Sequence, residues 1–168
     1  MKFSYRKATF VPTAILLGVA MALLNIVAYL YLSQDALSVV AWLFITLLLL
    51  FVVGISPFLT DHELTDRELI LRQGLLFKAV IPLRDIRGVK EIDSGPSKTG
   101  VFFAYRGTSI YVTTQKSNLI LIELRGARRF RWALAKKADR IYFNVNDQSR
   151  MVRMLTERII PASRAQSS

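Results

Sequence analysis

The sequence contains no cysteine. Disulfides, thiolate metal sites and cysteine nucleophiles are therefore excluded. The absence agrees with a protein whose polar part lies in the cytoplasm, where disulfides are rare. Any chemistry must rest on other side chains.

Histidine is almost as scarce, since His62 is the only one in the chain. It lies in the acidic stretch DHELTDRE, residues 61–68. A zinc protease needs a second histidine, as in H-E-x-x-H, and a serine hydrolase needs a serine that pairs with the imidazole. Neither pattern is present, so a solvated connector is favoured over a metal site or a hydrolase centred on His62. We expect a protein that is not an enzyme and that has no catalytic residue, metal or cofactor.

Nucleotide binding is disfavoured as well. The segment SGPSKTG, residues 94–100, contains G-x-x-K-T. A phosphate-binding loop instead has G-x-x-x-x-G-K-[ST] between a strand and a helix, and here strands are expected on both sides. The segment is therefore interpreted as a plain loop.

Two long stretches, residues 10–32 and 37–59, have no charged residue. At about 1.5 Å per residue, each would form a helix long enough to cross ~30 Å of hydrocarbon. A cleaved signal peptide is the alternative for the first stretch, because Ala20 and Ala22 form an A-x-A-like site, but the apolar run continues to Leu32. With a connection of only residues 33–36, the pattern predicts a transmembrane hairpin over residues 10–59.

Lysine and arginine are unevenly distributed around this hairpin. Lys2, Arg6 and Lys7 precede it, none lies in residues 33–36, and the other twenty follow it. Because positively charged flanks stay inside, both termini are expected in the cytoplasm. The sequence therefore predicts a multi-pass protein of the inner, cytoplasmic membrane, with residues 1–9 as a cytoplasmic N-terminus.

Small and polar residues recur on one face of each expected span. Such residues let helices approach closely, and an amide in hydrocarbon requires a hydrogen-bond partner. We predict a helix–helix interface, either within the hairpin or with a helix of a partner protein, made by Ala14, Gly18, Ala22, Asn25, Thr46 and Gly54.

From residue 61 onward, short apolar runs alternate with turn signals, which is typical of many short strands. About seven strands are expected, at residues 69–71, 77–81, 86–92, 101–105, 110–114, 119–124 and 141–145. Gly88 predicts a bulge, and Pro82 predicts an edge position or a bulge. An amphipathic helix capped by Asn146 or Asp147 should follow and end before Pro161, and residues 161–168 form a mobile tail. The fold class is thus a membrane helical hairpin plus an α+β domain at residues 61–160, a curled antiparallel sandwich or open barrel.

The stretch LTDRELILRQGLLFKAVIPLRDIRGV, residues 64–89, resembles the opening of bacterial pleckstrin-homology-like domains. The matching positions are Leu64, Thr65, Asp66, Glu68 to Ile70, Gly74, Ile81 to Leu83, Ile86 and Val89. The closing IYFNVNDQSRMVRML, residues 141–155, is similar to the last strand and C-terminal helix of such domains. The resemblance implies a binding or assembly module, often preceded by a membrane hairpin, and does not say what is bound.

Positive charge dominates residues 61–168, where twenty Lys and Arg stand against eleven Asp and Glu, a net charge of +9. Such a domain is attracted to an anionic cytoplasmic leaflet. The residues expected to contact lipid headgroups are Arg128, Arg129, Phe130, Arg131, Trp132, Lys136 and Lys137. Alternatively, Phe130, Trp132 and Leu134 alternate inward as the core face of a strand, and Arg129 and Arg131 are merely solvated. Nucleic acid is a disfavoured third ligand, since the domain is membrane-anchored.

These patterns predict a non-enzymatic membrane protein that presents a basic domain to the cytoplasmic surface for docking, assembly or lipid sensing. The expected partners are anionic headgroups and either a partner protein or a second copy of the chain. The alternative is an accessory subunit of a larger membrane enzyme or transporter, in which the small-residue helix face and the strand edges contact other proteins.

Overall fold

The computed structural model describes residues 1–32, 35–96, 98–104, 107–130 and 137–164. The chain forms two compact units. The helical unit comprises Lys7–Thr60 together with Gly74–Leu76. The β domain comprises Met1–Arg6, Asp61–Gln73 and Phe77–Ser168. The chain therefore leaves the β domain after Arg6 and returns to it at Asp61.

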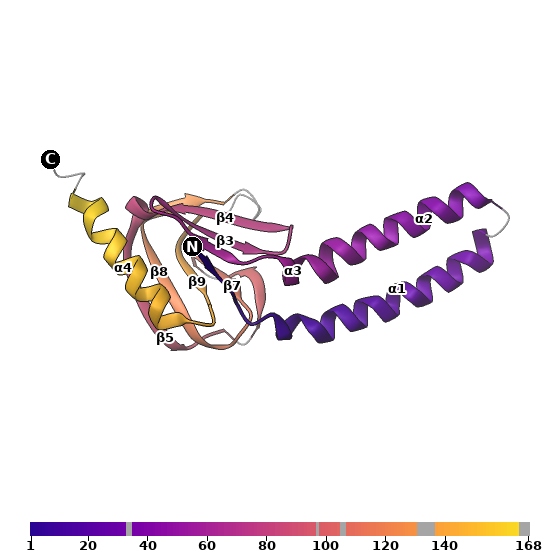
Figure 1. Ribbon diagram of the computed structural model, residues 1–168, viewed down its shortest axis with the longest axis horizontal. Helices are drawn as coiled ribbons and strands as arrows, with labels where there is room; N and C mark the ends of the chain where they lie inside the picture. The colour runs from indigo at the N-terminus through magenta and orange to yellow at the C-terminus, as the bar shows by residue number, and fades with distance from the viewer. Residues whose placement is uncertain (33–34, 97, 105–106, 131–136, 165–168) are drawn as a thin grey trace. The chain divides into compact units, whose positions relative to one another are not determined.

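The helical unit is a helical hairpin, as expected from the two uncharged stretches (Figure 1). Its elements in chain order are the 3₁₀ turn η1 (Lys7–Phe10), α1 (Val11–Leu32), α2 (Ala36–Leu49), the π-helical η2 (Leu50–Ile55) and α3 (Ser56–Leu59). Asp35 caps α2, because its carboxylate accepts a hydrogen bond from Leu37 N at 3.2 Å. Both helices are long and apolar enough to cross a membrane.

The β domain contains two sheets. The first has the strand order β1-β2-β3-β4 and consists of β1 (Lys2–Phe3), β2 (His62–Leu64), β3 (Glu68–Gln73) and β4 (Phe77–Pro82). The second has the order β5-β8-β9-β7-β6 and consists of β5 (Ile86–Ser94), β6 (Gly100–Phe103), β7 (Ser109–Thr113), β8 (Ser117–Arg129) and β9 (Lys137–Phe143). The described residues thus form nine strands, where about seven were expected.

Several local predictions agree with the strand register. The ladder between β5 and β8 shifts between Ile86 and Gly88, which is the expected bulge. Pro82 ends β4, an edge strand, where its missing N–H costs no ladder bond. One expectation was wrong: β7 pairs with β9 in parallel, so the second sheet is mixed and not wholly antiparallel.

The two additional strands lie on either side of the helical unit in the chain. Lys2 pairs with Glu63 and Phe3 with His62, so the N-terminal residues join the first sheet as an edge strand. The Met1 amino group also donates a hydrogen bond to Leu64 O at 2.7 Å. Residues 1–6 are therefore part of the β domain, and the expected N-terminal segment of residues 1–9 is divided between the two units.

The core of the β domain is shared by both sheets and by the C-terminal helix α4 (Gln148–Arg164), which packs against β5 and β8 (Figure 1). Asp147 caps this helix, accepting from Arg150 N at 3.2 Å. Met151 and Leu155 are buried in the core, as their helical spacing predicts. The helix continues to Arg164, so the expectation that it ends before Pro161 was wrong.

Candidate membrane and partner surfaces

A polar contact between the two long helices joins Asn25 to Thr46. Thr46 Oγ1 lies 3.1 Å from Asn25 Oδ1 and 3.0 Å from Leu43 O, and its hydroxyl proton can serve one acceptor at a time. The Asn25 Nδ2 group donates to Met21 O at 2.9 Å. Thr46 is only 4% exposed although it lies among apolar side chains. The pair therefore satisfies two polar side chains that hydrocarbon would leave without partners.

The predicted small residues of the hairpin differ in whether another helix lies close to them. Gly54 is buried, and a Cβ there would lie 3.2 Å from Leu50 Cδ1 and 3.5 Å from Leu17 Cδ2, so a close approach exists at this position. A Cβ at Gly18 would meet nothing within 4 Å, and Ala22 is exposed. Of the predicted interface residues, Asn25 and Thr46 contact each other, and Gly54 lies close to Leu17 of α1. The hairpin does not bring Gly18 or Ala22 into a close helix contact.

The end of the second apolar helix contains two hydroxyl groups, those of Ser56 and Thr60, for which the sequence predicted no role. Ser56 N bonds to Phe51 O, five residues back, because the helix is π-helical there. The Ser56 hydroxyl donates to Val52 O at 2.5 Å and accepts from Leu75 N at 2.9 Å. Thr60 Oγ1 accepts from Gly74 N at 2.9 Å. The turn at residues 74–76 is thus hydrogen-bonded to the end of the apolar helix.

His62 is buried in β2, so the expectation of a solvated connector was wrong at this residue. Its ring is 1% exposed and lies between Tyr5, at 5.0 Å between centroids, and Phe143, at 5.8 Å. Its Nδ1 accepts a hydrogen bond from Arg72 N at 3.2 Å. Burial lowers the pKa of His62 to about 4, against an opposing effect of the Asp61 charge. The imidazole is therefore neutral at pH 7, and its role here is in packing and hydrogen bonding.

Metal binding has no support in the part of the chain that the structure describes. Within it, no group of three His, Cys, Asp or Glu side chains is arranged to hold an ion. The Nδ1 atom of His62 already accepts a hydrogen bond from the backbone amide of Arg72. Its ring is flanked by Tyr5 and Phe143.

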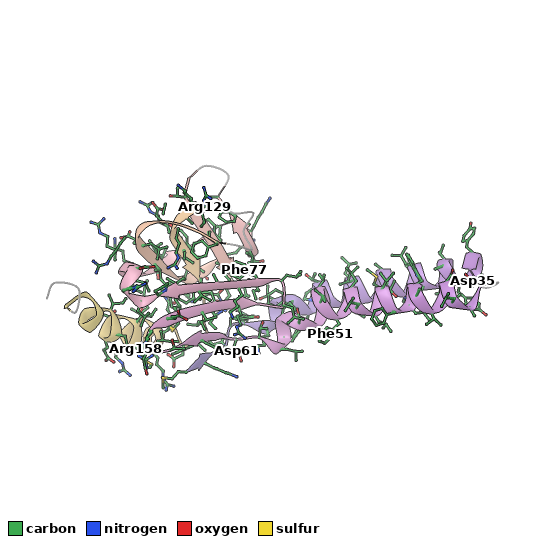
Figure 2. The ribbon with its side chains drawn as sticks, turned by 90° about the horizontal axis from the view of Figure 1, so that it is seen from above. Asp35, Phe51, Asp61, Phe77, Arg129 and Arg158 are labelled. Atoms are coloured by element: carbon green, nitrogen blue, oxygen red, sulfur yellow. The ribbon has the colours of Figure 1, made fainter. Side chains whose placement is uncertain are left out.

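A basic ribbon, which we define as Arg125, Arg128, Arg129 and Lys137, lies at the end of β8 and the start of β9. All four side chains are exposed, and Arg129 lies on the outside of the β domain (Figure 2). Arg128 forms an ion pair with Asp85, whereas within the described residues no ion pair is found for the other three cations of the ribbon. The register shifts between Glu123 and Arg128, so the ribbon is a distinct extension of the ladder.

The aromatic part of the predicted lipid-contact set has a different place. Phe130 is 5% exposed and belongs to the core, as the alternative interpretation held. It therefore does not face lipid headgroups. Arg131, Trp132 and Lys136 lie outside the described residues.

Three aromatic rings form a ladder on the second sheet that the sequence reading did not predict. Phe102, Tyr111 and Tyr142 stack across β6, β7 and β9, with centroids 4.9 and 4.5 Å apart. The rings contact one another face to face, so those faces are not free to stack on bases. Burial, and then the charge of Tyr142, raise the pKa of Tyr111.

Comparisons of this chain with models of known families, with curated proteins and with solved structures found no match.

Proposed function

We propose that the chain is a non-enzymatic integral membrane protein that presents a basic, pleckstrin-homology-like domain at the cytoplasmic surface for docking, assembly or lipid sensing. The single observation that carries the proposal is the path of the chain. It leaves the β domain at Arg6, runs through two apolar helices and returns at Asp61. Two crossings of a bilayer would bring the chain back to the side from which it started.

The surface of the helical unit supports a lipid environment. Its exposed residues are predominantly apolar, as the side chains along α1 and α2 in Figure 2 illustrate. Large exposed apolar side chains follow one another on both helices, among them Leu16, Leu30, Phe44 and Leu47. Soluble proteins rarely expose a continuous apolar surface of this extent. The distribution of Lys and Arg supports a cytoplasmic location for both flanks of the hairpin.

The basic ribbon supplies the proposed binding surface for anionic headgroups. Basic side chains near an anionic leaflet contribute about 1 kcal/mol each. Arg125, Arg129 and Lys137 are exposed and carry their charge on adjacent strands. The sequence resemblance of residues 64–89 to pleckstrin-homology-like domains supports a binding role of this kind.

The test uses the full chain in nanodiscs of zwitterionic lipid, mixed with vesicles that contain or lack phosphatidylglycerol. Co-flotation with the anionic vesicles is expected, and it should weaken as salt is added. Reversing the charge of Arg125, Arg129 and Lys137 should weaken binding by about a hundredfold or more, at about 1 kcal/mol per residue.

The matched control reverses three exposed cations elsewhere on the β domain, Lys98, Lys116 and Arg153, and so produces the same net charge. If both triple variants lose binding equally, net charge and not the ribbon is responsible. Flotation that does not depend on anionic lipid would contradict the headgroup proposal.

An accessory subunit of a larger membrane complex is the second candidate function. The observation that favours it is β6, an edge strand of the second sheet that exposes Val101. Edge strands can accept a strand from a partner. The mass of the particle purified in mild detergent tests this candidate, and a lone protomer would count against it.

A further inference from the structure

The turn between β3 and β4 belongs to the helical unit although the strands on either side of it do not. Gly74–Leu76 groups with Lys7–Thr60. Two hydrogen bonds of 2.9 Å join the turn to this unit, from Gly74 N to Thr60 Oγ1 and from Leu75 N to Ser56 Oγ. Both acceptors are side chains at the end of the second apolar helix.

The contact is close enough to require glycine at its centre. Gly74 has φ +67°, and a Cβ there would lie 2.7 Å from Ser56 Oγ and 3.3 Å from Pro57 Cγ. Both Ser56 and Pro57 are buried. The backbone of the turn is thus hydrogen-bonded to the helix end. The two leucine side chains of the turn take no part in these hydrogen bonds.

Those two leucines are exposed. Leu75 is 57% exposed and Leu76 is 55% exposed, beside hydrogen-bonded backbone that fixes the turn. In the same unit, Leu59 is 67% exposed and Ile55 is 43% exposed, at the same end of the second helix. The turn therefore adds two exposed leucines at a helix end that already exposes apolar side chains, and the proposed function assigns that helix to lipid.

We propose that Leu75 and Leu76 insert into the bilayer at the boundary between headgroups and acyl chains, as a third membrane contact beside the two helices. Apolar side chains at such a boundary lie about 5–10 Å into the membrane. We assign lipid as the occupant because the turn is hydrogen-bonded to the end of the second apolar helix, where Ile55 and Leu59 are exposed as well. This inference rests on the proposed function, since it requires the second helix to span the bilayer.

The absence of cysteine allows a clean test. Leu75→Cys and Leu76→Cys, each labelled with an environment-sensitive fluorophore, are reconstituted as full chains in vesicles of phosphatidylcholine and phosphatidylglycerol. Emission is quenched separately by lipids with a shallow spin label, by lipids with a deep spin label and by aqueous iodide. Leu47→Cys, exposed on α2, reports the span, and Lys98→Cys, exposed in the β domain, reports water.

The expected result is quenching by the shallow lipid label several-fold stronger at residues 75 and 76 than at residue 98, with little effect of iodide. If iodide quenches labels at residues 75 and 76 as strongly as at residue 98, the leucines are in water and the insertion is overturned. If the deep spin label still quenches at residue 47 in that case, the membrane-spanning helices stand. Protection at 75 and 76 from both lipid labels and iodide would also overturn the insertion, and would indicate a protein partner. Iodide quenching at 47 would overturn both the insertion and the proposed function.

Discussion

The hydroxyl of Thr46 on α2 lies 3.1 Å from the carboxamide oxygen of Asn25 on α1. The two residues are 21 positions apart in the chain and come from opposite helices of the hairpin. In a bilayer, helices gain no hydrophobic drive to associate, so contacts of this type hold them together.

Replacing Asn25 by leucine should therefore weaken the hairpin. Interhelical hydrogen bonds in membranes average about 0.6 kcal/mol and reach about 1.7 kcal/mol. A double-mutant cycle with Thr46→Val, measured as the free energy of unfolding in mixed detergent micelles, should give a coupling energy in this range. Ala22→Leu is the control, because Ala22 is exposed and its substitution should have little effect. A coupling energy near zero would show that the Thr46 hydroxyl prefers the carbonyl of Leu43.

Gly74→Ala should destabilise the protein more than Gly107→Ala does. Both glycines have positive φ, +67° and +114°, so each alanine incurs backbone strain of about 1–3 kcal/mol. Only at Gly74 would the new Cβ also meet an atom at 2.7 Å, the Ser56 hydroxyl oxygen. Thermal unfolding of the two variants compares the costs directly. Equal losses would mean that the turn can move off the helix end without penalty.

Much of the secondary structure was predictable because it depends on local patterns. The uncharged runs, the bulge at Gly88 and the cap at Asp147 each follow from a few neighbouring residues. β1 and β2 were not predictable, because strands of two and three residues have no period to detect. The pairing of β1 with β2 also joins residues that lie on either side of the helical hairpin in the sequence.

The candidate surfaces were predictable only in part, for a related reason. Composition indicated three members of the basic ribbon but not Arg125. Alternation could not decide whether Phe130 faces lipid or core, and the structure buries it. The roles of Ser56 and Thr60 depend on a turn more than ten residues away. The only sequence signal for Ser56 and Thr60 was that a polar residue ends an apolar stretch. Many helices end in this way, so the signal does not identify a contact with the turn.

The buried histidine makes the β domain sensitive to acid. His62 binds a proton with a pKa of about 4 when folded and of 6.5 when unfolded. Between these values the unfolded state binds more protons, so stability rises with pH and is lost as pH falls from 6.5 towards 4. The full shift corresponds to about 3 kcal/mol, at about 1.4 kcal/mol per pKa unit.

Urea unfolding at pH 7, 6, 5 and 4.5 measures this dependence. Protonation of Nδ1 would also remove the acceptor of Arg72 N, so amide hydrogen exchange in β3 should accelerate in the same range. In His62→Asn the side-chain oxygen can still accept from Arg72 N, and the pH dependence between 6.5 and 5 should largely disappear. If the pH dependence of stability is unchanged in His62→Asn, titrating carboxylates and not His62 cause it.

The pairing of β1 with β2 predicts that residues 61–168 do not form a stable domain by themselves. Removing residues 1–6 takes Phe3 and Tyr5 out of buried positions, and Tyr5 is 1% exposed. Losing one large buried aromatic side chain typically costs about 3–5 kcal/mol, a large part of the stability of a small domain. Antiparallel pairing places Lys2 opposite Glu63 and Phe3 opposite His62, so the residues that follow Phe3 run towards those that precede His62.

A short Gly-Ser linker in place of residues 7–60 should therefore restore the fold without the membrane helices. We expect cooperative thermal unfolding for the linked chain and a broad or absent transition for residues 61–168 alone. Tyr5→Ala in the linked chain should lower its stability by the amount expected for a buried aromatic residue. A free fragment as stable as the linked chain would show that β1 only covers the edge of the first sheet, and that the β domain does not depend on the segment that precedes the hairpin.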